Sequence, residues 1–121
     1  PRIHLITSTL DRPEVLGLIA VCDAYVSLHR AEGFGRTLAE AMLFGKPVVA
    51  TNVGSTSEVI INNETGIVTS KNKAELVDAL NQLLDNPENL EKMGKNAALH
   101  AQEAFAPSSI INKHIDLYKA L

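Results

Sequence analysis

Two glutamates flank a short segment that contains two glycines. Glu32 directly precedes Gly33, Gly35 follows, and seven residues separate Glu32 from Glu40. Because glycine has no Cβ, such a segment can approach a ligand closely and direct its amides at it. A helix that starts here adds free N–H groups that favour phosphate. Carboxylates accept hydrogen bonds from diols and repel phosphate oxygens, so the combination predicts a site for a nucleotide sugar.

The same spacing also has a purely structural interpretation. Thr37 and Glu40 fit a capping box, in which the glutamate would accept a hydrogen bond from the threonine amide. Ser55 and Glu58 fit the same pattern at the next predicted helix. Spacing alone leaves both interpretations open.

Composition and charge exclude several other kinds of protein. Eleven basic and fourteen acidic side chains give a net charge of −3, and the basic residues are scattered along the 121-residue chain. This is not the electrostatic pattern of a nucleic-acid-binding protein. Cys22 is the one cysteine, and no two histidines are four residues apart, so neither a disulfide nor a metal site is expected.

The chain has no apolar run near the ~20 residues that a membrane-spanning helix needs. A lone cysteine fits a reducing compartment. We therefore expect a cytoplasmic location, with or without peripheral attachment to a membrane.

The hydrophobic pattern predicts strands that alternate with helices. Strands are expected at 3–7, 25–28, 47–51 and 67–69, and helices at 11–22, 37–44 and 57–61, with three more after Asn72, Asn86 and Pro107. The apolar stripes at 76–84 and 110–121 are interpreted as core packing and not as binding grooves, unless a partner domain outside this segment covers them. This order predicts an α/β fold: a partial Rossmann-like three-layer domain with a parallel sheet of about four strands and C-terminal helices. We expect residues 1–121 to form this single partial domain, excised from a longer polypeptide.

A longer stretch around the glycines resembles a known family. Residues 27–42 and the Gly-Lys-Pro-Val segment at 45–48 resemble the group 1, retaining glycosyltransferases of the GT-B fold. The signature of this family is a Glu, seven residues and a second Glu, in the local form Glu-Gly-Phe-Gly. The resemblance extends over residues 5–69 and implies a fragment of the C-terminal, donor-binding domain.

The resemblance implies a role for each matching residue. Glu32 would be catalytic, beside the anomeric carbon of the donor sugar, and Glu40 would bind the ribose. The base would lie near Thr9 and Leu10. The nucleotide-sugar-binding residues would be Thr9, Leu10, Gly33, Phe34, Gly35, Arg36, Thr37, Leu38 and Glu40.

The implied reaction transfers a sugar, with retention, from a UDP- or GDP-linked donor to an acceptor glycan, lipid or other hydroxyl compound. It needs no metal and no cofactor, and would serve polysaccharide biosynthesis. Since the family's acceptor domain and its phosphate-binding Arg and Lys lie outside this segment, the chain alone is expected to be inactive. It is also expected to self-associate through an uncovered strand edge. The alternatives are a non-catalytic nucleotide-binding or interaction module, and a GT-B nucleotide-sugar epimerase.

Overall fold

The computed structural model describes residues 2–121 and confirms the α/β fold. Strands β1 (Tyr25–Ser27), β2 (Val48–Thr51) and β3 (Gly66–Thr69) form a parallel sheet in the order β1-β2-β3. Because the strands are parallel, their carboxyl ends meet at one edge of the sheet. The residues that follow β1 and β2 therefore emerge side by side.

Six helices are described, and three of them begin at a side-chain cap that the sequence predicts. They are α1 (Arg12–Val21), α2 (Arg36–Leu43), α3 (Thr56–Val59), α4 (Lys73–Leu84), α5 (Pro87–Phe105) and α6 (Pro107–Ala120). Asp11 and Glu14 form a capping box at α1. Asn72 and Asn86 accept hydrogen bonds from first-turn amides of α4 and α5.

Both faces of the sheet are covered, which gives the predicted three layers. Val48 and Ala50 of β2 pack on one face with residues of α1, α2 and α3. Val49 packs on the other face with residues of α4. Helix α5 contributes to both clusters, so it joins the two layers.

Helix α5 passes very close to the turn between α2 and β2. A Cβ on Gly94 would lie 2.2 Å from the carbonyl oxygen of Gly45 and 3.3 Å from Pro47. Beyond this contact, Ala97 and Ala101 pack into the same core cluster as Ala41 and Met42 of α2. Helix α5 therefore runs along α2 toward the carboxyl edge of the sheet.

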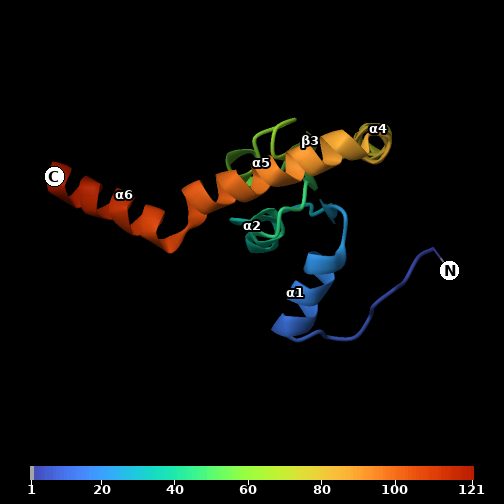
Figure 1. The fold of residues 1–121 in the computed structure, drawn as a ribbon, viewed down its shortest axis with the longest axis horizontal. Helices are drawn as coiled ribbons and strands as arrows, with labels where there is room; N and C mark the ends of the chain where they lie inside the picture. Colours follow the sequence, from blue (N-terminus) through green and yellow to red (C-terminus); the bar gives the residue numbers. More distant parts are fainter. Residues whose placement is uncertain (1) are drawn as a thin grey trace.

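The predicted strand at 3–7 is wrong, and the sheet has three strands instead of about four. Ile3 and Leu5 are 84% and 86% exposed, and residues 2–10 have no ladder partner among the described residues. Figure 1 shows this N-terminal segment reaching away from the sheet. Residues with high β propensity form a strand only where a neighbouring strand is available to form hydrogen bonds with their backbone.

The predicted core packing of α6 is also wrong. None of the residues of α6 is buried, and Ile110, Ile111 and Ile115 are all exposed. Figure 1 shows α6 extending from the end of α5, away from the sheet and its covering helices. The interpretation of the stripe at 76–84 is confirmed in part. Leu83 is buried and Leu76 and Leu80 pack against the core cluster, whereas the side chains of Val77 and Leu84 are exposed.

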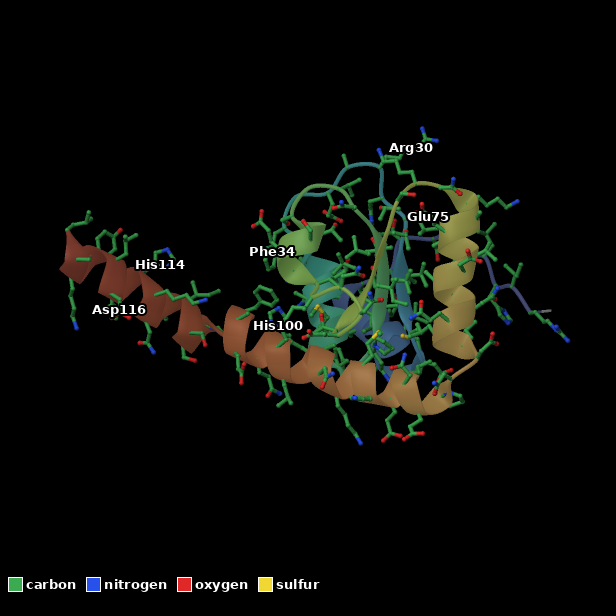
Figure 2. All side chains as sticks on the ribbon, turned by 90° about the horizontal axis from the view of Figure 1, so that it is seen from above. Arg30, Phe34, Glu75, His100, His114 and Asp116 are labelled. Atoms are coloured by element: carbon green, nitrogen blue, oxygen red, sulfur yellow. The ribbon has the colours of Figure 1, made fainter. Side chains whose placement is uncertain are left out.

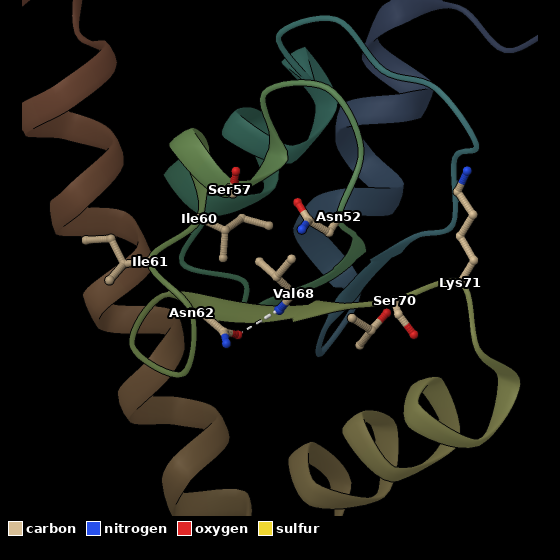
Figure 3. Close-up of a pocket in the computed structure, with 9 residues that line it drawn as sticks. Asn52, Ser57, Ile60, Ile61, Asn62, Val68, Ser70 and Lys71 are labelled. Carbon is tan, nitrogen blue, oxygen red and sulfur yellow. Dashed lines mark hydrogen bonds between the residues drawn. The ribbon is translucent and has the colours of Figure 1, made fainter.

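The outer edge of β3 is covered by the segment that precedes it. Asn62 forms a parallel bridge with Gly66, and its side-chain oxygen accepts a 2.8 Å hydrogen bond from the Val68 amide (Figure 3). The Asn63 amide donates to the Gly66 carbonyl at 2.7 Å. Two outward-facing backbone groups of β3 are thus already bonded within the chain.

Candidate functional site

The glycine segment forms a turn between β1 and α2 at the carboxyl edge of the sheet. Gly35 is the N-cap of α2 and has a left-handed backbone with φ +79°. A Cβ there would lie 2.9 Å from Leu38 Cδ1, so glycine is required by the fold itself. At Gly33 a Cβ would meet no atom within 4 Å. Packing therefore gives no reason for glycine at position 33.

The amino end of α2 lies beside this turn. Gly35 supplies no side-chain cap, and the first hydrogen bond of the helix runs from the Ala39 amide to the Gly35 carbonyl at 3.2 Å. The N–H groups of Thr37 and Leu38 belong to the first turn and have no intrahelical acceptor. The Leu38 side chain is buried beneath the turn, against Gly35, so Leu38 can offer a ligand only its backbone.

Glu40 does not form the capping box with Thr37. Its Oε1 accepts from Arg12 Nη2 at 2.7 Å and from Arg36 Nε at 3.1 Å, and 13% of its side chain is exposed. Both contacts use Oε1, which leaves Oε2 without a partner among the residues described. The carboxylate is therefore held in place with one oxygen available to accept hydrogen bonds.

Glu32 folds back on its own turn. Its Oε1 accepts from the Gly33 amide at 3.1 Å, and its Oε2 lies 3.5 Å from His29 Nδ1. The same His29 nitrogen is hydrogen-bonded to the Ser27 hydroxyl at the end of β1. His29 is not among the site residues predicted from the sequence, and its position three residues before Glu32 is the sequence signal for this contact.

The loop after β2 clamps the glycine turn. A Cβ on Gly54, which has φ +54°, would lie 1.7 Å from the Glu32 carbonyl oxygen. Ser55 donates to the Gly33 carbonyl through its amide, at 3.3 Å, and also through its hydroxyl. Ser55 makes no side-chain cap, so the second predicted capping box is wrong as well. The Glu32–Gly33 backbone is thus fixed by a segment more than twenty residues away.

The remaining predicted site residues lie around this centre. Phe34 is at the tip of the turn with 52% of its surface exposed. Thr9 is exposed and Leu10 half-buried, just before α1. Arg12, two residues after Leu10, connects this segment to Glu40. The structure therefore gathers residues 32–40, and the link from the N-terminal segment to them is made by Arg12 and not by Thr9 or Leu10.

Two cavities open at the carboxyl edge of the sheet. One of about 430 Å³ is lined by Leu28, His29, Arg30, Thr51, Ser70, Lys71 and Leu76. His29 separates it from Glu32. Another, of about 720 Å³, lies between β3 and α3 and includes none of the predicted site residues (Figure 3).

Among residues 2–121, no group of three or more His, Cys, Asp or Glu side chains is placed to hold a metal ion. No helix among these residues combines the length and apolar character that crossing a membrane requires.

A parallel sheet between helical layers, with a glycine turn and a helix amino end at its carboxyl edge, defines a Rossmann-like α/β domain. The family model described as "Glycosyl transferases group 1" matches residues 3–100. The chain belongs to this family.

Named relatives agree with this assignment. The chain is 39% identical over 94 residues to a D-inositol 3-phosphate glycosyltransferase of Arthrobacter sp. (strain FB24), covering 77% of this chain and 22% of that protein. It is 30% identical over 119 residues to the O-antigen chain mannosyltransferase C of Escherichia coli, covering 95% and 32%. The chain thus spans between about a fifth and a third of the length of these relatives.

Solved structures share the fold. HepE of Anabaena, in complex with UDP and glucose, is 29% identical and superposes with a TM-score of 0.75 over 91% of this chain and 30% of that chain. The C-terminal domain of LpcC from Francisella tularensis superposes with a TM-score of 0.71 at 24% identity, covering 85% and 52%. The fold therefore corresponds to part of a GT-B glycosyltransferase.

Proposed function

We propose that this chain supplies part of the donor site of a retaining, metal-independent glycosyltransferase. The observation that carries the proposal is the glycine turn, with Glu32 before it and Glu40 in the helix after it, at the carboxyl edge of a parallel sheet. Open α/β sheets bind ligands at this edge. The donor is a UDP- or GDP-linked sugar, and the UDP bound in HepE makes uridine nucleotides the first to test.

The diphosphate binds at the amides of the turn and of the first turn of α2. Thr37 and Leu38 contribute N–H groups that have no intrahelical acceptor, and the positive end of the helix dipole favours the anion. Arg36, beside these amides, adds positive charge. The ribose hydroxyls donate to Oε2 of Glu40, whose other oxygen is held by arginines.

Glu32 faces the donor sugar. As the nucleoside diphosphate leaves, the anomeric carbon gains positive charge, which a nearby carboxylate stabilises. His29 and the Gly33 amide hold this carboxylate in position before the donor binds. Fixed groups of this kind lower the barrier without the cost of reorganisation during the reaction.

We expect no turnover by this chain alone, because the acceptor domain and the family's phosphate-binding Arg and Lys are not part of these 121 residues. The intact enzyme acts in the cytoplasm, free or peripheral to the membrane, on an acceptor glycan, lipid or other hydroxyl compound. Transfer by the isolated 121-residue chain would contradict this part of the proposal.

Gly33 provides a direct test of the donor site. A methyl group at Gly33 meets no protein atom within 4 Å, so Gly33→Ala removes only the space that a ligand would occupy. In the intact enzyme, we expect Gly33→Ala to weaken UDP or GDP binding at least about tenfold (~1.4 kcal/mol) without changing the melting temperature. Gly17→Ala, which also meets no atom, is the matched control and should bind as wild type.

The same titration separates the alternatives. Wild-type affinity of Gly33→Ala would mean that the turn does not approach a nucleotide. Nucleotide binding without sugar transfer would favour a non-catalytic nucleotide-binding module, and epimerisation of the nucleotide sugar would favour a GT-B epimerase. An intact protein that binds none of UDP, GDP and ADP would be an interaction module.

A further inference from the structure

The exposed ring at the tip of the glycine turn is held from one side by an aromatic side chain of α5. The rings of Phe34 and Phe105 pack edge to face, with centroids 5.3 Å apart and an interplanar angle of 81°. Phe105 is the last residue of α5 and is far from the turn in sequence. Figure 2 shows Phe34 beside the end of α5.

A second ring supports Phe105 in turn. His100 packs against Phe105 with centroids 5.6 Å apart and an interplanar angle of 82°. Its Nε2 is buried and has no hydrogen-bond partner among the residues described. Because an unpartnered buried nitrogen is unfavourable, ring packing against Phe105 is the interaction that accounts for the position of His100.

Phe105 lies at the end of the core face of α5. Ala97 and Ala101, on the same face, are fully buried, whereas Phe105 is partly buried and packs against the same core cluster. Phe105 therefore joins this core cluster to Phe34 of the glycine turn.

We propose that Phe105 is a positioning residue for the donor site, acting through Phe34; the proposal rests on the donor-site function given above. Glycines on both sides of Phe34 give the turn backbone more conformational freedom than other residues would, so ordering the turn costs more entropy. Ser55 holds the Gly33 carbonyl by hydrogen bonds, and the ring of Phe105 is the contact that holds Phe34. A turn that is ordered before binding loses less entropy when the nucleotide arrives.

The test is a double-mutant cycle in the intact enzyme. Phe34→Leu, Phe105→Leu and the double variant are titrated with UDP, GDP and ADP, and the nucleotide that wild type binds most tightly is used. We expect each single variant to weaken binding about threefold to tenfold, which is the range of an aromatic pair. The double variant should be no weaker than Phe34→Leu alone, because both changes remove the same contact.

Two further variants distinguish positioning from general packing. Phe105→Tyr keeps the ring edge and should restore affinity to near wild type. Leu99→Ala, at an exposed site elsewhere on α5, is the matched control and should leave affinity unchanged. Melting temperatures are measured for all variants, and the losses of affinity should not follow the changes in melting temperature.

Wild-type affinity of Phe105→Leu, or losses that multiply in the double variant, would overturn the positioning role while leaving the donor site intact. An intact wild-type protein that binds none of the three nucleotides would instead overturn the donor site, and the positioning role with it.

Discussion

Arg12, in the first turn of α1, and Glu40, in the second turn of α2, connect two helices that are far apart in the sequence. Arg12 Nη2 lies 2.7 Å from Glu40 Oε1, across 28 positions of the chain. Glu40 is therefore a link between α1 and α2 as well as a candidate ligand for the donor ribose. Each of these roles makes its own prediction.

We expect Glu40→Gln in the intact enzyme to weaken nucleoside diphosphate binding at least about tenfold (~1.4 kcal/mol). The free energy of unfolding should fall by no more than ~1 kcal/mol, because a partly exposed ion pair contributes little. Calorimetric titration and thermal unfolding measure the two effects.

Arg12→Gln is the control for this variant, since it breaks the same ion pair and leaves the carboxylate. It should lose similar stability and much less affinity. If the two variants lose affinity equally, the link between the helices, not a contact of Glu40 with ribose, explains the effect.

Glu32→Gln should reduce kcat at least about a hundredfold, roughly 2.7 kcal/mol. A carboxylate that acts on the developing positive charge stabilises the transition state more than the ground state. Affinity for the nucleoside diphosphate should change little, because that ligand carries no sugar. Initial rates with saturating donor measure the effect, and Glu88→Gln on the exposed start of α5 is the control. Near-normal turnover of Glu32→Gln would reduce Glu32 to a residue that shapes the loop.

Gly54→Ala should be strongly destabilising. Its Cβ would collide with the Glu32 carbonyl, and a left-handed backbone at a residue with a side chain by itself costs ~1–3 kcal/mol. Chemical denaturation should show a loss of at least ~2 kcal/mol.

Ser55→Ala is the milder change at the same clamp. The variant keeps the hydrogen bond from the residue 55 backbone amide to the Gly33 carbonyl and removes only the one from the hydroxyl. The protein should therefore fold, and its kcat should fall several-fold. Ser57→Ala, on the neighbouring α3, should behave as wild type. Unchanged kcat in Ser55→Ala would show that the hydroxyl does not help to position Glu32.

The isolated 121-residue chain should self-associate as its concentration rises. Among the described residues, β1 has a neighbouring strand on one side only, so its other edge is open to pairing. The apolar side chains of Ile3 and Leu5, in the segment before α1, are also exposed. Sedimentation velocity over a hundredfold range of concentration measures the effect.

Val26→Lys in β1 should weaken the association if strands pair. If Ile111→Lys in α6 weakens it and Val26→Lys does not, the exposed face of α6 is the contact instead.

Local signals predicted the elements well. Asp11, Asn72 and Asn86 mark helix starts through side chains that bond amides two or three residues later, so neighbouring positions carry the whole signal. The apolar Val48–Thr51 segment similarly predicted a strand that is buried on both faces. The candidate site at 32–40 could be predicted because its residues are close in sequence, and its role remains a prediction.

Predictions failed where the partner is distant in sequence. Residues 3–7 and α6 have the right periodicity for a strand and a packed helix, but periodicity does not say whether a partner surface exists. Glu40 and Ser55 match a capping pattern, yet their partners are Arg12 and Gly33. The contact of Phe105 with Phe34 was likewise out of reach of any local pattern.

The hydrogen bonds that Asn62 and Asn63 make along β3 determine which edge of the sheet can be extended. With the Val68 amide and the Gly66 carbonyl already occupied, a further strand cannot form a regular ladder on that side. Among the described strands, a new strand from outside this chain or from a second copy can therefore form a regular ladder only at β1, which directly precedes the turn that carries Glu32. Extension of the sheet is thus coupled to the candidate donor site through β1.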